Sequence, residues 1–205
     1  MIDTHDRILE TAKNLYHEGG FQSVTMRKVA AELDLSATAI YRHFRNKEHL
    51  LIALFEDAHR TFTRYLWESL GGGTPLERFR SAGEAYLRFA LEEPLYYQMV
   101  FMAPSSHLGY EEMPETICEE LNRSFHFLVD RVRECMNEGL FTEGVPERTA
   151  VAVWAHSHGV ISLYLTGQLN DLVGSREEFE AFYWEAMQPL MQGLQPHNGG
   201  GRDRS

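Results

Sequence analysis

The residues from Ser36 to Lys47 have the types and the spacing of a helix that reads DNA. The first four, Ser36 to Ala39, are small, so a helix that begins with them can bring its end close to base edges. Their hydroxyls can bond bases and their methyl groups can meet a thymine methyl. Tyr41, Arg42 and His43 follow, and side chains of these types can reach phosphates.

Two short helices joined by a tight turn would position these side chains. Thr25 is a candidate N-cap for a helix of residues 26–33, and residues 34–35 form the turn. Ser36 can cap the next helix, which continues to about residue 43. This arrangement is a helix-turn-helix, in which the second helix enters the major groove. The same pattern also fits a surface helical hairpin with a solvated basic face, so on its own it leaves both interpretations open.

Net charge supports contact with DNA only when it is divided along the chain. The whole chain carries −11, of which residues 1–60 carry −1 and residues 61–205 carry −10. Residues 24–47 hold five basic and two acidic side chains, a net charge of +3. Because salt screens charges beyond about 10 Å, the local charge decides phosphate contact. The acidic remainder is expected to stay off the duplex.

The bulk composition is that of an ordinary globular protein. Of the 205 residues, 43% are apolar and 24% are charged. The first ten residues lack the apolar core of a signal peptide, and the chain has no uninterrupted apolar run of about 18 residues, which a membrane-spanning helix needs. Cys118 and Cys135 are too few for a disulfide framework, so we expect reduced, buried thiols. These features predict a cytoplasmic protein that does not contact membranes.

Apolar residues recur with helical spacing throughout, which predicts an all-α fold of about nine helices. Glycine or proline separates most of them, at Gly19-Gly20, Gly71 to Gly73, Pro94 and Pro146 among others. The expected helices lie at about residues 3–18, 26–33, 36–43, 46–70, 75–92, 95–102, 114–137, 147–169 and 176–194, with a loop at 103–113. The eighth is apolar nearly all round, so it should be buried on several sides.

Residues 6–55 resemble the DNA-binding domain of the tetracycline-repressor (TetR) family of transcriptional regulators. The matching pieces are RILETAKNLYHEGGFQSVTMRKVAAELDLS and IYRHFRNKEHLL, in the family's order and spacing. The resemblance implies that Thr25 and Tyr41 contact phosphates and that Ser36 to Ala39 face the bases. Thr38 stands where the family often has glycine. With the basic residues nearby, the residues expected to bind DNA are Thr25, Arg27, Lys28, Ser36, Ala37, Thr38, Ala39, Tyr41, Arg42, His43 and Lys47.

The family pairs this DNA-binding domain, residues 1–47, with a helical domain that binds a ligand and dimerises, residues 48–194. The first is called the reader and the second the body. The segment AYLRFALEEPLYYQMVF and the later VWAHSHGVISLYL resemble one subgroup, which carries a Trp-x-x-x-His-Gly element at Trp154 to Gly159. The division implied is a DNA-binding domain at 1–47, a ligand-binding and dimerisation domain at 48–194, and a disordered tail at 195–205. No cofactor is expected.

Aromatic residues and methionines are dense in the body, which favours an adaptable apolar pocket. For any one of them, a place in the core is the simpler interpretation. His158 could orient a ligand or could be a hydrogen-bonded core histidine. The candidate ligand contacts are Phe62, Tyr65, Tyr86, Phe89, Tyr97, Met99, Met102, Phe125, Trp154 and His158.

Two kinds of chemistry are disfavoured within the eighth helix. Residues 155–159 mimic the nucleophile elbow of an esterase, but that motif works on a strand-to-helix turn and not inside a helix. His156 and His158 point in opposite directions on a helix, so they cannot hold one zinc ion together. We therefore expect neither an enzyme nor a metal site.

The expected function is a ligand-responsive, DNA-binding transcriptional regulator, most simply a repressor. The alternative is a helical ligand-binding or scaffolding protein without operator function. The regulator is expected to be a homodimer on a palindromic double-stranded operator, released by a small apolar or aromatic effector. The expected dimer face lies on the ninth helix and comprises Phe179, Phe182, Ala186 and Leu190.

Overall fold

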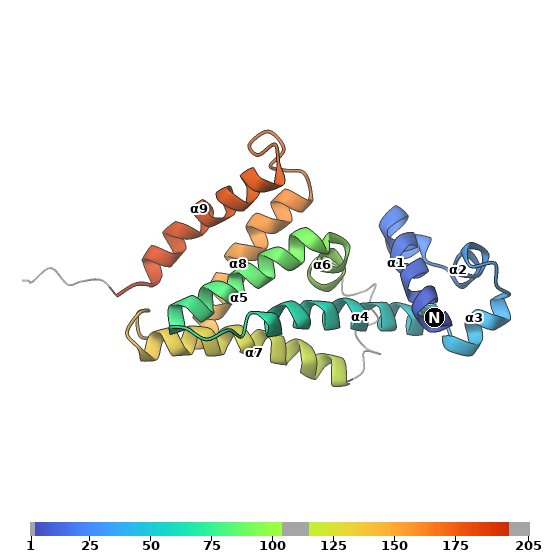
Figure 1. Cartoon of the computed structure of the whole chain (residues 1–205), viewed down its shortest axis with the longest axis horizontal. Helices are drawn as coiled ribbons and strands as arrows, with labels where there is room; N and C mark the ends of the chain where they lie inside the picture. The colour runs from blue at the N-terminus through green and yellow to red at the C-terminus, as the bar shows by residue number, and fades with distance from the viewer. Residues whose placement is uncertain (1–2, 104–114, 197–205) are drawn as a thin grey trace, which may run out of the picture. The chain divides into compact units, whose positions relative to one another are not determined.

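The computed structural model describes residues 3–103 and 115–196, and these residues form nine helices and no strand (Figure 1). The predicted all-α class is therefore confirmed for the described chain. The helices are α1 Thr4–Ser23, α2 Met26–Glu32, α3 Ala37–His43, α4 Lys47–Glu68, α5 Pro75–Glu92, α6 Pro94–Phe101, α7 Glu115–Asn137, α8 Pro146–Leu165 and α9 Arg176–Leu194. Residues 104–114 and 197–205 lie outside the described residues, so most of the predicted loop at 103–113 and of the predicted tail at 195–205 lies outside them.

The chain forms two compact units. Unit 1 comprises Met1–Arg64 and Glu93–Leu121, and unit 2 comprises Tyr65–Glu92 and Asn122–Ser205. Helices α4 and α7 each contribute residues to both units. This grouping follows compactness, whereas the predicted boundary after Lys47 follows function, so that boundary stays a prediction.

Side-chain caps begin α2, α3 and α4, and those at Thr25 and Ser36 are the ones that the sequence predicts. The Thr25 hydroxyl accepts a hydrogen bond from the Lys28 amide at 3.2 Å, which caps α2. The Ser36 hydroxyl accepts one from the Ala39 amide at 3.2 Å, which caps α3. The Asn46 carbonyl oxygen accepts one from the His49 amide at 2.9 Å, at the start of α4. Each cap satisfies a backbone amide that the helix itself leaves without a partner.

Helix α1 is interrupted where the sequence places Gly19 and Gly20. Gly19 has a φ of −160° and Gly20 a φ of +65°, and neither has helical backbone angles. The positive φ at Gly20 lies in the region that glycine enters without steric penalty. The predicted end of the regular helix near Glu18 agrees with this break.

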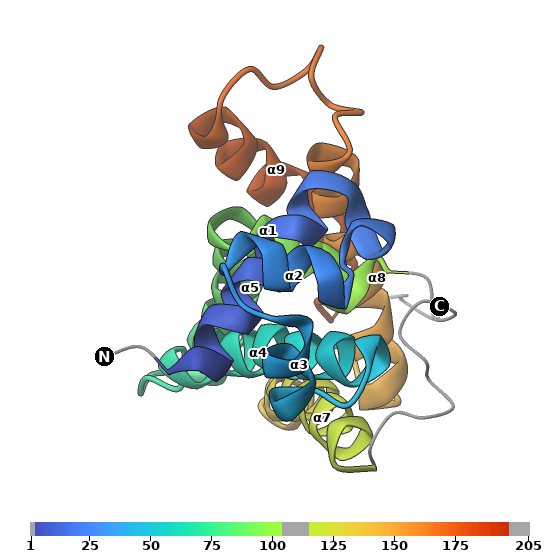
Figure 2. The same ribbon diagram turned by 90° about the vertical axis from the view of Figure 1, so that its right-hand side faces the viewer.

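Apolar side chains from four helices form the core of unit 1. Ile8 of α1, Val29 of α2 and Ile40 of α3 are completely buried, as is Leu54 of α4. Figure 2 looks onto α1, α2 and α3, which lie side by side. One residue from each short helix thus anchors it, and the opposite faces stay exposed.

Helix α8 departs from the prediction that it is buried on several sides. Ala150, Val153, Ser157 and Ile161 are buried and share one face of the helix. Figure 1 shows α8 and α9 side by side. By contrast, Val151 and Leu163 are 49% and 47% exposed. The apolar sequence of α8 therefore covers two faces, of which only one is buried within a single chain.

The cysteines only partly match the prediction of two buried thiols. Both lie on α7, as expected, but Cys118 is exposed and only Cys135 is buried. Burial raises the pKa of the Cys135 thiol to about 11, so it stays protonated at neutral pH.

Asp34 provides a test of the turn between α2 and α3. Its φ is +53°, in the left-handed region, which costs an ordinary side chain roughly 1–2 kcal/mol. We expect Asp34→Val to lower the free energy of unfolding by about 1–2 kcal/mol, since a β-branched side chain fits this region worst. Asp34→Gly should leave it unchanged or raise it. Urea unfolding followed by circular dichroism measures both, and equal losses in the two variants would contradict the assignment.

Candidate DNA-binding and ligand-binding residues

The start of α3 presents a small and open surface, as the sequence predicts for the residues that face the bases. Ser36, Ala37 and Thr38 are exposed, whereas Ala39 is half-buried. The Ser36 oxygen accepts the Ala39 amide hydrogen, so its own hydroxyl hydrogen remains available as a donor. Thr38 is the member of this group with both a methyl and a hydroxyl, so it is the strongest candidate for reading a base.

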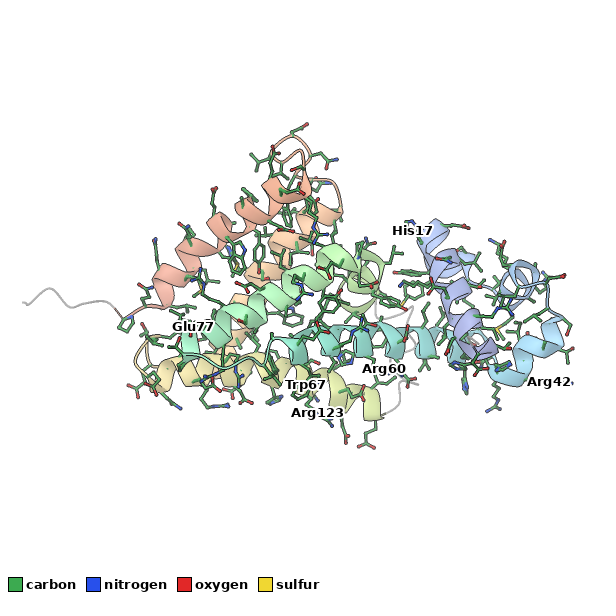
Figure 3. All side chains as sticks on the ribbon, viewed as in Figure 1. His17, Arg42, Arg60, Trp67, Glu77 and Arg123 are labelled. Atoms are coloured by element: carbon green, nitrogen blue, oxygen red, sulfur yellow. The ribbon has the colours of Figure 1, made fainter. Side chains whose placement is uncertain are left out.

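Larger polar side chains follow on the exposed faces of α3. Tyr41 is 53% exposed, and Arg42 and His43 are exposed as well. Figure 3 shows the Arg42 side chain on the outer side of α3. Arg27 and Lys28 are exposed on α2. The cations predicted to contact phosphates therefore stand in solvent, where they can meet a duplex.

Lys47 has a structural contact that sequence reasoning missed. Its ammonium donates a hydrogen bond to the Phe21 carbonyl at 2.6 Å, and the side chain is half-buried. This bond joins the start of α4 to the end of α1. The ammonium retains two further donors, but Lys47 holds the reader together in addition to its predicted phosphate contact.

His5 is another reader residue that the sequence did not single out. Its ring stacks on Phe44 with centres 4.9 Å apart, and it lies 6.4 Å from the ring of His43. The stack ties the first turn of α1 to the end of α3. The separation of about 40 positions in the chain explains why local patterns gave no signal for it.

The predicted ligand contacts fall into both units. Phe62, Tyr97, Met99 and Met102 belong to unit 1. There, Phe101 lies 5.1 Å from both Phe62 and Tyr97 between ring centres, so these rings form one aromatic cluster. In unit 2 the predicted contacts are Tyr65, Tyr86, Phe89, Phe125, Trp154 and His158.

A chain of hydrogen bonds joins several of the candidates in unit 2. The Trp154 indole donates to the Tyr86 hydroxyl at 3.1 Å, and that hydroxyl lies 3.4 Å from His158 Nδ1. His158 Nε2 lies 3.2 Å from the Ser162 hydroxyl. If Nδ1 accepts from Tyr86, Nε2 carries the proton and donates to Ser162. Each hydrogen bond from Trp154 through Tyr86 and His158 to Ser162 then has one donor and one acceptor, and the four side chains carry no net charge.

Burial supports the uncharged form of His158, because it lowers the pKa of the imidazole below its ordinary value. The Tyr86–His158 separation of 3.4 Å is at the long limit for such a bond. A polar atom of a ligand would replace this long Tyr86–His158 hydrogen bond more easily than the two shorter ones.

Ser157 is placed unlike a nucleophile. It is buried within α8, and its hydroxyl lies 2.7 Å from the Tyr183 hydroxyl. Burial raises the pKa of Tyr183 to about 12, so this phenol stays protonated. The Ser157–Tyr183 bond satisfies two polar groups between α8 and α9, and it explains the serine without catalysis.

Residues 3–103 and 115–196 contain neither a candidate metal site nor a candidate membrane-spanning helix. Within these ranges no group of three or more His, Cys, Asp or Glu side chains is arranged to hold a metal ion. Over the same ranges no helix combines the length and the apolar character needed to cross a bilayer.

The predicted dimer face on α9 differs in exposure along its length. Phe179 is completely buried within the single chain and stacks on Tyr164, with ring centres 3.8 Å apart. Phe182, Ala186 and Leu190 are half-buried. Phe179 therefore serves the packing of its own chain, while the other three can still meet a partner.

Two family models match the chain. One, described as bacterial regulatory proteins of the tetR family, matches residues 8–54. The other, described as the tetracyclin repressor-like C-terminal domain, matches residues 79–187, more than half of the chain. The chain belongs to the TetR family. The first match contains every residue predicted to bind DNA, and the second contains most of the predicted ligand contacts.

Relatives of this TetR-family protein include other helix-turn-helix regulators. YerO of Bacillus subtilis, an uncharacterized HTH-type transcriptional regulator, is 24% identical over 205 residues, which cover 95% of this chain and 66% of YerO. KstR of Mycolicibacterium smegmatis, an HTH-type transcriptional repressor, is 37% identical over 73 residues, which cover 35% of this chain and 36% of KstR. The chain thus spans just under two thirds of YerO and about a third of KstR.

Solved structures share the fold of the TetR-family chain. The TetR family transcriptional regulator PfmR from Thermus thermophilus has a TM-score of 0.73 at 24% identity, covering 93% of this chain and all of PfmR. The ketosteroid transcriptional regulator KstR2 of Mycobacterium tuberculosis has a TM-score of 0.72 at 16% identity, covering 96% and 97%. At these identities the likeness shows the fold alone.

His158 gives this TetR-family protein a predicted dependence on pH. Because its pKa is lowered on folding, its contribution to stability is fully present above the ordinary value of 6.5 and is lost as the pH falls toward the lower folded value. We expect the unfolding temperature of the wild type to fall more steeply below pH 6.5 than that of His158→Gln. His17→Gln, at an exposed histidine, is the control (Figure 3). Parallel pH profiles for the wild type and His158→Gln would contradict the role assigned to burial.

Proposed function

We propose that this protein is a sequence-specific transcriptional repressor that leaves its DNA operator when a small apolar or aromatic ligand binds. The observation that carries the proposal is the exposed, small-residue start of α3 with Arg42 beside it. A helix of this kind fits the major groove, and its basic flank fits the phosphates. The similarity to KstR, which is a transcriptional repressor, supports the direction of regulation.

The operator is proposed to be palindromic, because two copies of the chain would present two recognition helices related by a twofold axis. Half-sites for such dimers lie about 34–36 Å apart, or at multiples of this spacing. The two sources of specificity are then the base contacts at Ser36 to Ala39 and the distance between the two copies of α3.

The dimer is proposed to form through α8 and α9. Val151, Ala155, Gly159 and Ser162 lie on one stripe of α8, at the spacing of successive turns. Val151 and Ala155 are exposed, as is Leu163 beside the stripe, while the opposite face of α8 is buried. With Phe182, Ala186 and Leu190 of α9, this surface would build a four-helix interface with a second copy. Phe179 is left out, because its own chain covers it.

The ligand is proposed to be uncharged, apolar and provided with one polar atom. The aromatic residues supply apolar contact, and the chain of Trp154, Tyr86 and His158 supplies hydrogen bonds without a net charge. A charged ligand would meet no ion of opposite charge among these three hydrogen-bonded side chains. The shared fold with KstR2, a ketosteroid transcriptional regulator, supports a ligand of this general type. The element from Trp154 to Gly159 supports membership of the Trp-His-Gly subgroup.

Release from DNA is proposed to follow from movement of α4. This helix contributes residues to both units and begins directly after the recognition helix. A coupling free energy of about 1–3 kcal/mol would change operator affinity by roughly 5- to 150-fold. A helical ligand-binding or scaffolding protein remains the alternative, and a complete failure to shift DNA from its own promoter region would favour it.

Arg42 tests contact with DNA. Arg42→Ala should weaken binding to operator and to random DNA alike, and should lower the slope of log affinity against log salt by about 0.9, because one phosphate contact is lost. The matched control is Arg60→Ala, which removes another exposed cation, from α4 (Figure 3). Fluorescence anisotropy over a salt series measures both. A salt slope that is the same in wild type and Arg42→Ala would remove Arg42 from the phosphate contacts.

Leu163 tests the dimer. Leu163 lies beside the α8 stripe within the proposed apolar interface, and a glutamate at this position would place a charge there. Leu163→Glu should therefore shift the protein to monomers in sedimentation velocity. Leu70→Glu is the control, since Leu70 is similarly exposed at 43% but lies outside α8 and α9. If Leu163→Glu and Leu70→Glu sediment alike as dimers, the interface lies elsewhere.

A further inference from the structure

Lys13 connects α1 of the reader to α6. Its ammonium lies 3.3 Å from a carboxylate oxygen of Glu93, the residue just before α6. The same ammonium lies 3.9 Å from the centre of the Tyr96 ring, over its face. A single side chain from α1 therefore holds both a charge and an aromatic face at the start of α6. All three residues belong to unit 1.

Tyr96 extends this contact to α4. The ring is 5% exposed, and its hydroxyl donates a hydrogen bond to a carboxylate oxygen of Asp57. Burial first, and then the bond to Asp57, raise the pKa of Tyr96 far above its ordinary value, so the phenol remains a donor. Tyr96 thus meets α1 with its ring face and α4 with its hydroxyl.

Helix α6 depends on tertiary contacts for its position, and the contacts of Lys13 and Tyr96 are among them. It has only eight residues, and isolated helices shorter than about 12 residues are marginal in water. Glu93 occupies the N-cap position but makes no capping bond there. Its carboxylate is instead bonded to Lys13, so the residue that could stabilise α6 locally is used to attach it to α1.

The same short helix carries two of the proposed ligand contacts. Tyr97 and Met99 are on α6, one and three positions after Tyr96, and are 0% and 1% exposed. A ligand that rearranges these side chains would therefore displace the helix to which Lys13 is attached.

We propose that Lys13 is a positioning residue that links α6 directly to the helix-turn-helix, in addition to the path through α4. Displacement of α6 draws Glu93 and Tyr96 away from the Lys13 ammonium and loosens α1. Helix α1 packs against α2, and α2 packs against α3. Loosening of α1 therefore makes the position of α3 less fixed, and DNA affinity falls. By thermodynamic linkage the effect is reciprocal, so DNA binding stabilises the position of α6. This regulation rests on the proposed function.

The first experiment uses the free protein and needs no DNA. Hydrogen exchange is compared in the full chain for wild type, Lys13→Met, Glu93→Gln and the double variant. Methionine keeps much of the apolar stem and removes the charge. Each single variant should exchange about tenfold faster in both α1 and α6, which corresponds to about 1.4 kcal/mol. The double variant should be no faster than Lys13→Met, because Lys13→Met already removes the ion pair that Glu93→Gln removes.

Arg88→Met is the matched control for the loss of a cation. Arg88 also pairs with a carboxylate, that of Glu92 at 3.5 Å, and also lies over a tyrosine ring, that of Tyr65 at 5.3 Å. These contacts are in unit 2, so α1 and α6 should exchange as in wild type. Unchanged exchange in α1 of Lys13→Met, or additive effects in the double variant, would overturn the link.

The second experiment adds a duplex from the region upstream of the protein's own coding sequence. In wild type, bound DNA should slow exchange in α6, and Lys13→Met should abolish this slowing and weaken binding about tenfold. The slope of log affinity against log salt should not change, because Lys13 acts through α6. A slope lowered by about 0.9 would make Lys13 a phosphate contact and overturn the proposal. If wild type binds no duplex, the proposed function fails, while the first experiment still decides whether Lys13 joins the two helices.

Discussion

The reader depends on one constraint, which is that its helices are too short to be stable alone. Helices α2 and α3 have seven residues each, well below the length at which isolated helices persist in water. Their position must come from neighbours, and the burial of Val29 and Ile40 supplies it. The caps at Thr25 and Ser36 add local stability without using any exposed surface. The face that meets DNA is therefore free to carry small and polar residues.

Contacts between residues far apart in the chain complete this support. Lys47 bonds the carbonyl of Phe21, and His5 stacks on Phe44. Both contacts place a polar or titratable side chain at a joint between helices. Lys47 therefore has a contact within the chain in addition to its predicted contact with phosphate.

In the body, the polar side chains Ser157 and His158 of the apolar helix α8 make hydrogen bonds to other side chains of the same polypeptide. Ser157 meets Tyr183, and His158 lies between Tyr86 and Ser162. An unbonded polar group inside such a helix would cost about 1–3 kcal/mol, so these bonds allow polar residues on α8 without loss of stability. The remaining face of α8 carries Val151 and Leu163 and needs no such partners.

Local rules predicted much of the fold, and non-local contacts account for what they missed. The caps at Thr25 and Ser36 and the glycine break in α1 follow from local residue preferences, and the helix bounds follow from the apolar periodicity. The burial of α8 was overestimated, because an apolar sequence does not say whether its cover comes from the same chain or from a second copy. The roles of Lys47 and His5 needed coordinates, since each pairs with a residue more than 20 positions away.

The tryptophans give the molecule a built-in optical property. Trp67, Trp154 and Trp184 are the three tryptophans of the sequence, and all belong to unit 2. Tryptophan emission, excited at the long-wavelength edge of protein absorption, therefore arises from the body alone, because the reader has no tryptophan. Because Trp154 lies 6.4 Å from the ring of His158 and is bonded to Tyr86, its emission is coupled to the polar chain that a ligand would disturb. The protein thus carries a native fluorophore beside its proposed ligand contacts, without any label.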